Sequence, residues 1–178
     1  MNLISSDLII YMQDLATLNL EVLNSGNISI RLANGLIAIK PSGLAYNNIK
    51  KNKVPLINKQ GQHISGLKPS SDIAIHLEIY LRKPEINCII HTHSHYATVM
   101  SILGKPLKIL STLHADYFGR EIFCMPYVNH RVENIGTRVV KSKENVMLLS
   151  HHGTLVIDKD PRRAIKNVVA LEEISKIN

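Results

Sequence analysis

The sequence predicts a single α/β or α+β domain over residues 1–178, in which helices flank a largely antiparallel central sheet. Three observations support this fold class. Segments with helical spacing of apolar residues alternate with short apolar runs typical of strands. Several of these runs are joined by short polar turns, which is typical of hairpins. The chain of 178 residues is 45% hydrophobic, which is enough for one core of ordinary size.

The first part of the chain is predicted to contain one helix and two hairpins. The helix is capped by Ser5 or Ser6, and its apolar residues at helical spacing are Leu8, Met12, Leu15 and Leu18. The first hairpin pairs Ile28–Leu32 with Leu36–Lys40 through Asn34-Gly35, a dipeptide that favours tight antiparallel turns. The second pairs Val54–Ile57 with His63–Ile64.

The rest of the chain is predicted to alternate between helices and strands. Ser70 or Ser71 begins a helix that Pro84 closes, the buried strand Cys88–His93 follows, and a helix then covers Tyr96–Leu103. Two further strands, Val146–Leu149 and Thr154–Ile157, flank the tetrapeptide Ser-His-His-Gly. Asp160 as N-cap and Pro161 at the first helical position open the last helix.

Composition excludes several classes of protein. The formal charge is +7, but the basic residues are dispersed, aromatic content is 4% and tryptophan is absent, so we expect no nucleic-acid partner and instead a local anion pocket. No apolar run approaches the ~18–20 residues of a membrane span, and the N-terminus lacks the basic region of a signal peptide, so we expect a cytoplasmic protein without a membrane partner. Cys88 and Cys124 form no Cys-x-x-Cys pair, which predicts reduced, buried thiols.

Histidines at two strand ends are the strongest chemical signal. His91 and His93 are two residues apart in a strand, so their imidazoles lie on one face and can share a cation. His151 and His152 follow another strand and offer a third ligand, and Asp72 offers a nearby carboxylate as ligand or base. Three histidines with one open position suit a catalytic zinc ion. The alternative is that these are exposed polar residues at strand ends.

Three small polar turns form the second signal. They contain Ser25-Gly26-Asn27, Ser42-Gly43 and Ser70-Ser71. Backbone N–H groups in such turns and at helix starts bind phosphate. Each turn alone could simply end an element, and only their joint use with a metal site favours a phosphosugar pocket.

Five stretches together resemble one family. They are SGNIS at 25–29, KPSG at 40–43, KPSSD at 68–72, HTHSHYAT at 91–98 and HHG at 151–153, with LEE at 171–173 in the last helix. In this order they resemble the class II aldolase family, which includes adducin heads and the L-ribulose-5-phosphate 4-epimerases. The resemblance spans almost the whole chain and implies a class II aldolase-like fold.

The resemblance also implies roles for particular residues. The metal ligands would be His91, His93 and His152, with Asp72 as the acidic residue beside the metal and a catalytic acid/base. The metal would be Zn²⁺ or another divalent ion such as Mn²⁺ or Co²⁺. The phosphate of a small phosphorylated sugar would be held by Gly26, Asn27, Ser42, Gly43, Ser70 and Ser71.

The implied reaction breaks and re-forms a C–C bond of a phosphorylated ketose through an enediolate. LHADYF at 113–118 resembles the epimerases and places the 4-epimerase first, with Asp116 as an acid/base offered across a subunit boundary of a homotetramer. The segment 124–136 is more similar to the fuculose-phosphate aldolases, which are the alternative. No residue matches the C-terminal catalytic tyrosine of the epimerases. A non-catalytic adducin-like binding module ranks third, because adducin heads lack the metal histidines that this chain keeps.

Overall fold

The central feature of the fold is an eight-stranded sheet. The computed structural model describes residues 6–129 and 135–178, and the strand order is β4-β3-β2-β1-β5-β8-β7-β6. Every neighbouring pair is antiparallel except β6 and β7, which are parallel. The strands are β1 (Asn27–Arg31), β2 (Ile37–Ile39), β3 (Leu56–Ile57), β4 (His63–Ser65), β5 (Cys88–Thr92), β6 (Phe123–Met125), β7 (Val146–Leu149) and β8 (Gly153–Asp158).

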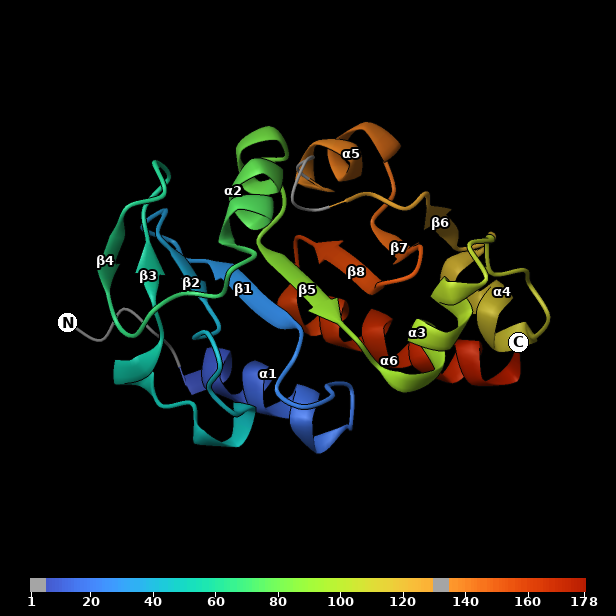
Figure 1. Cartoon of the computed structure of the whole chain (residues 1–178), viewed down its shortest axis with the longest axis horizontal. Helices are drawn as coiled ribbons and strands as arrows, with labels where there is room; N and C mark the ends of the chain where they lie inside the picture. Colours follow the sequence, from blue (N-terminus) through green and yellow to red (C-terminus); the bar gives the residue numbers. More distant parts are fainter. Residues whose placement is uncertain (1–5, 130–134) are drawn as a thin grey trace.

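Six α-helices of the described residues surround this sheet. They are α1 (Ser6–Thr17), α2 (Ile73–Arg82), α3 (His95–Ile102), α4 (Thr112–Phe118), α5 (Ile135–Ser142) and α6 (Pro161–Ile177). Helices α1 and α6 lie on one face of the sheet and α2 and α5 on the other, while α3 and α4 lie at the end nearest β6 (Figure 1). The single domain with a mostly antiparallel sheet is therefore confirmed, and it has three layers.

Each face of the sheet has its own apolar core. On the α1 and α6 side, Leu8, Met12 and Leu15 of α1 pack with buried residues of the central strands such as Ile90 and Val156. On the α2 and α5 side, a second cluster includes Ile79, Ile89 and Val139. Alternation along β5 explains the division, since successive side chains of a strand point to opposite faces.

Most of the predicted elements are confirmed. Both hairpins pair as expected, and Asp160 caps α6 by accepting a hydrogen bond from the Arg162 backbone N–H at 2.9 Å. Of the two predicted caps of α1, Ser5 lies outside the described residues, and Ser6 is the first residue of the helix rather than the residue before it. Leu18 was predicted to continue the apolar stripe of α1, but the helix ends at Thr17 and Leu18 is 46% exposed. Cys88 and Cys124 are free and buried, as predicted.

Two α-helices and one strand of the described residues were not predicted, nor were two short 3-10 helices, Tyr46–Asn48 and Lys51–Lys53. Helices α4 and α5 and strand β6 all fall between residues 104 and 145, where the apolar runs are short. In the described ranges 6–129 and 135–178 no helix has the length and apolar character needed to cross a membrane.

Candidate functional site

The ends of three neighbouring strands meet at one edge of the sheet. β5 lies between β1 and β8 and pairs antiparallel with both, so the start of each flanking strand lies beside the end of β5. His93 directly follows β5, and His152 directly precedes β8. Antiparallel pairing therefore brings together histidines that are about 60 residues apart in the sequence.

The imidazoles of His91, His93 and His152 contact one another. Their ring centroids are 4.6 to 5.0 Å apart, and one ligand atom from each lies within 4.8 Å of the others. The Nε2 atoms of His91 and His93 are 2.9 Å apart. These three side chains could hold a metal ion.

The ring of His91 is oriented by the neighbouring strand. Its Nδ1 donates a hydrogen bond to the backbone carbonyl oxygen of Thr154 at 2.7 Å. Because a carbonyl only accepts, the hydrogen of the neutral ring is on Nδ1, and the bare Nε2 faces His93. A backbone carbonyl that holds the distal nitrogen in this way is typical of metal-binding histidines.

The electrostatics of the site favour neutral rings at His91 and His93. Burial, and then the neighbouring imidazoles of His93 and His152, lower the pKa of His91 to about 3. Burial and His152 also lower the pKa of His93. Both rings are therefore neutral at pH 7, which is the form that binds a metal.

Asp72 lies beside the triad, directly before α2. Its Oδ2 accepts a hydrogen bond from the Asn27 side-chain amide at 2.7 Å. Burial by itself would raise the pKa of Asp72, but the attraction of His91 and the hydrogen bond from Asn27 outweigh it and the pKa is lowered. The site thus contains an ionised carboxylate next to the neutral imidazoles of His91 and His93.

An open pocket of about 270 Å³ lies against these groups. The triad and Asp72 line it, together with three turns that contribute Asn24, Ser25, Gly26, Asn27, Lys40, Pro41, Ser42, Gly43, Ser70 and Ser71. A β-bridge between Pro41 and Pro69 holds the second and third turns side by side. All six residues predicted for the phosphate site therefore line one pocket with the predicted metal ligands.

Lys40 is a pocket residue to which the sequence analysis gave no role. It is 2% exposed, and its Nζ donates to the carbonyl oxygen of Asn24 at 3.1 Å and lies 4.7 Å from the centre of the Tyr46 ring. Burial lowers its pKa, although Glu21 acts in the opposite direction. The sequence did contain a signal for a special role of Lys40. This lysine ends the apolar strand Ile-Ala-Ile-Lys, and a buried cation is rare unless other groups pair with it.

Two glycines are required by close backbone approach at the triad. A Cβ atom at Gly26, where φ is +69°, would lie 2.6 Å from the carbonyl oxygen of His91. A Cβ atom at Gly153 would lie 2.5 Å from the carbonyl oxygen of Thr92 and 2.9 Å from Cδ2 of His93. The glycines of the SGN and HHG motifs therefore let β1 and β8 approach the end of β5.

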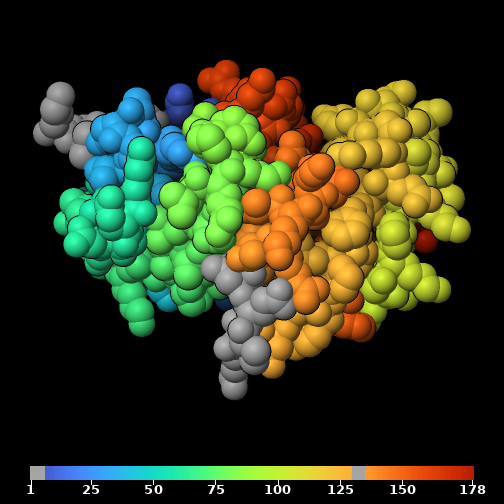
Figure 2. All heavy atoms as spheres, turned by 90° about the horizontal axis from the view of Figure 1, so that it is seen from above, coloured from blue at the N-terminus to red at the C-terminus, as the bar shows by residue number. Residues whose placement is uncertain are grey.

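Asp116 does not join this pocket within one chain. It is exposed on α4, which lies at the opposite end of the molecule from the two hairpins (Figures 1 and 2). His95 and His151 are also exposed and lie outside the triad. Of the segment 124–136, residues 130–134 lie outside the described residues.

A metal-capable histidine triad beside a pocket lined by serine- and glycine-rich turns, on a mostly antiparallel sheet with helices on both faces, is typical of a class II aldolase-type protein. The family model described as Class II Aldolase and Adducin N-terminal domain matches residues 6–178. The chain belongs to this family.

Solved structures agree with this assignment. An L-fuculose 1-phosphate aldolase is 28% identical, with a TM-score of 0.86 over 99% of this chain and 86% of the other. YgbL from Klebsiella pneumoniae, described as a putative aldolase/epimerase/decarboxylase, is 26% identical, with a TM-score of 0.85 over 96% of this chain and 86% of the other. A sugar-phosphate aldolase from Thermotoga maritima has a TM-score of 0.79 over 96% of this chain and 91% of the other, and at 20% identity it supports the fold alone.

Proposed function

We propose that this protein is a metal-dependent enzyme that cleaves a C–C bond in a phosphorylated ketose, with aldolase chemistry of the fuculose-phosphate type. The observation that carries the proposal is the arrangement at one strand edge, where three contacting imidazoles and an ionised Asp72 share a pocket with donor-rich turns. The 28% identical L-fuculose 1-phosphate aldolase supports the reaction class.

We propose that His91, His93 and His152 are the metal ligands and that Asp72 lies beside the ion. The chemistry of the donor set fits this role, since His91 presents a bare Nε2 toward His93 and both rings are neutral at pH 7. Nitrogen ligands with one open position favour Zn²⁺, although Mn²⁺ and Co²⁺ accept the same donors. When bound, such an ion supplies Lewis acidity toward the oxygens of the ketose.

Other residues of the chain bind the phosphate of the substrate and so position the bond that breaks. The turns with Gly26, Ser42, Gly43, Ser70 and Ser71 hold the phosphate, and the buried charge of Lys40 attracts it. Fixing the phosphate places the scissile bond next to Asp72.

Asp72 acts as the base in this scheme. It accepts the proton from the hydroxyl on the departing carbon, and the electron pair of the C–C bond moves toward the ketone end. The departing fragment leaves as an aldehyde, and the proton that Asp72 accepted passes to the remaining carbon, which completes the ketone product and regenerates the carboxylate.

The 4-epimerase is the second candidate, and two features of the chain favour it. The acidic residue is Asp72 rather than the glutamate of fuculose-phosphate aldolases, and LHADYF at 113–118 resembles the epimerases. An epimerase would retain the aldehyde, let it turn and re-add it on the other face. This activity stays a prediction.

We also propose a homotetramer in which Asp116 of one subunit reaches the pocket of another. Asp116 is exposed on α4, away from the pocket of its own chain. Large apolar side chains close to it in the sequence are also exposed, including Leu110 at 60% and Tyr117 at 46%. Exposed apolar residues that gather in one region are typical of protein interfaces.

Activity assays with two sugar phosphates test the proposed function. Protein loaded in turn with Zn²⁺, Mn²⁺ and Co²⁺ should release aldehyde from L-fuculose 1-phosphate, lose that activity after chelation and regain it when the metal returns. Epimerised L-ribulose 5-phosphate without free aldehyde would support the second candidate instead. If metal-loaded protein converts neither sugar phosphate, the proposed reaction is wrong.

A further inference from the structure

Helix α2 lies along strand β1, and the facing side chains are polar. On β1 they are Asn27, Ser29 and Arg31, which alternate onto one face of the strand. On α2 and directly before it they are Asp72, His76 and Tyr80, each one helical step of four residues from the next. Asn27, Ser29 and His76 are almost fully buried, as is Tyr80.

These six side chains form three consecutive contacts, which we call the polar ladder. The first is the Asn27–Asp72 hydrogen bond of 2.7 Å in the pocket. In the second, the Ser29 hydroxyl lies 2.6 Å from His76 Nδ1 and 2.8 Å from the Tyr80 hydroxyl.

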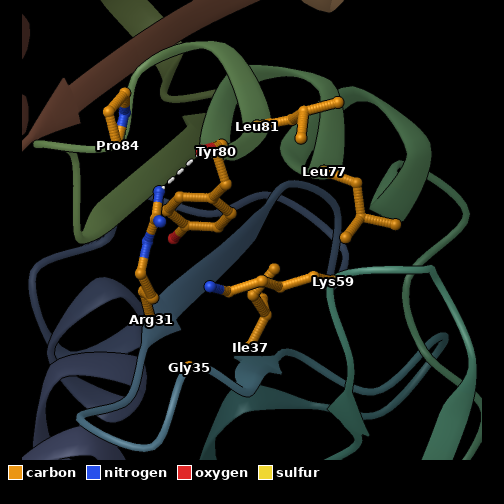
Figure 3. A pocket seen from close by; sticks show the side chains of 8 residues that line it. All are labelled: Arg31, Gly35, Ile37, Lys59, Leu77, Tyr80, Leu81 and Pro84. Carbon is orange, nitrogen blue, oxygen red and sulfur yellow. Dashed lines mark hydrogen bonds between the residues drawn. The ribbon is translucent and has the colours of Figure 1, made fainter.

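The third contact lies at the end of α2 farthest from the pocket. The Arg31 guanidinium donates to the Tyr80 carbonyl oxygen at 2.8 Å and lies 4.8 Å from the centre of the Tyr80 ring (Figure 3). It also donates to the Lys83 carbonyl oxygen at 3.3 Å, so it caps the last turn of the helix.

The spacing of strand and helix makes the ladder regular. Two residues of a strand advance roughly 6.7 Å, and four residues of an α-helix advance about 6 Å. The contacts therefore stay in register along the whole interface. A slip of the helix would break all three contacts together.

Stability alone does not account for a polar interface here. Apolar residues such as Ile79 already dock α2 on the apolar core of its own side of the sheet. Buried hydrogen-bonded groups give little net stability over well-packed apolar ones, but they are directional and hold one arrangement. What distinguishes this interface is that its first contact contains Asp72.

We propose that Ser29 and His76 are positioning residues, which lock α2 in register on β1 and so hold the Asp72 carboxylate in the pocket. This inference rests on the proposed function, since it assigns the purpose of the ladder to the carboxylate that acts as base. Neither residue lines the pocket, and both act through the elements that carry Asn27 and Asp72.

The decisive variant replaces both partners of the middle contact, Ser29→Ala/His76→Leu. No polar group is orphaned, because the Tyr80 hydroxyl still donates to the carbonyl oxygen of residue 29 at 3.0 Å. We expect near wild-type melting and metal content, with kcat on the sugar phosphate about 10- to 100-fold lower, the usual cost of losing an outer support of a site. KM should change little, since the phosphate turns are untouched.

Two further variants separate positioning from general packing. His76→Asn places an amide near the position of Nδ1, can still bond Ser29, and should retain most of the turnover. Ile28→Val removes one methyl group from the opposite, apolar face of β1, where Ile28 is fully buried, and should leave kcat unchanged.

A crystal structure of the double variant gives a readout that needs no substrate. A displaced Asp72, no longer 2.7 Å from Asn27 while the three histidines stay in place, supports the ladder. Wild-type kcat in the double variant, an equal loss in Ile28→Val, or an unmoved Asp72 would overturn it. If wild-type protein converts no sugar phosphate, the proposed function fails, and the position of Asp72 still decides this inference.

Discussion

Replacing Gly26 by alanine should damage the site far more than the same change at Gly43. Both glycines line the pocket and have nearly the same left-handed backbone, with φ of +69° and +68°. They differ in their surroundings. A Cβ atom at Gly43 meets nothing within 4 Å, whereas one at Gly26 lies 2.6 Å from the carbonyl oxygen of His91.

The expected magnitudes follow from this difference. A left-handed conformation costs a non-glycine residue roughly 1–2 kcal/mol, and the reduced freedom of the unfolded chain returns about 0.4–1 kcal/mol. Gly43→Ala should therefore lose about 1 kcal/mol. At Gly26 the close contact must also open by about 0.7 Å to reach an ordinary carbon–oxygen distance, and such overpacking adds about 1–3 kcal/mol.

Thermal melting and metal titration test the pair. For a chain of this size about 1 kcal/mol lowers Tm by roughly 2–4 °C, so Gly26→Ala should melt several degrees below Gly43→Ala. It should also bind Zn²⁺ about 10- to 100-fold more weakly, because the His91 backbone must move. Equal melting temperatures and equal metal affinities in the two variants would refute the reasoning.

Three other predictions concern the metal, the subunit boundary and acid stability. His93→Ala should lose bound metal by elemental analysis while His95→Ala keeps it, and equal metal content in both would contradict the triad. Asp116→Asn should lower kcat by about 10²–10⁴-fold with unchanged metal content, and full activity would remove Asp116 from the mechanism. Burial by itself would raise the pKa of Asp158, but the hydrogen bond from Arg163 outweighs it and the pKa is lowered. The ion pair therefore stabilises the folded state fully at pH values above the pKa of an aspartate in the unfolded chain, which is about 3.9. This stabilisation is lost as the pH falls through the lower pKa that Asp158 has in the folded state. Asp158→Asn should therefore cost about 1 kcal/mol at pH 7, and urea titrations at pH 7 and near pH 3 should show the difference from wild type shrinking in acid; a difference that stays constant would argue against the ion pair.

Local patterns predicted much of this fold because the deciding interactions are close in the sequence. The hairpin at Asn34-Gly35 and the cap at Asp160 depend on neighbouring backbone groups, and both are present. Helix α4 was missed because its seven residues contain no extended apolar period. Its N-cap, Ser111, accepts a hydrogen bond from the His114 backbone N–H, and this was the available signal.

The sequence by itself identified which residues gather at the site, since the same-face spacing of His91 and His93 and the order of the motifs pointed to the three histidines and the serine- and glycine-rich turns that line one pocket. Only the tertiary structure decided how these parts meet. Antiparallel pairing on both sides of β5 places His152 and Asn27 at the same strand end. It also decided the register of α2 on β1, because this register depends on contacts between segments that lie more than 40 residues apart along the chain. For Lys40 the local pattern marked only a lysine at the end of an apolar strand, and the tertiary structure decided its partners, the Asn24 carbonyl oxygen and the Tyr46 ring.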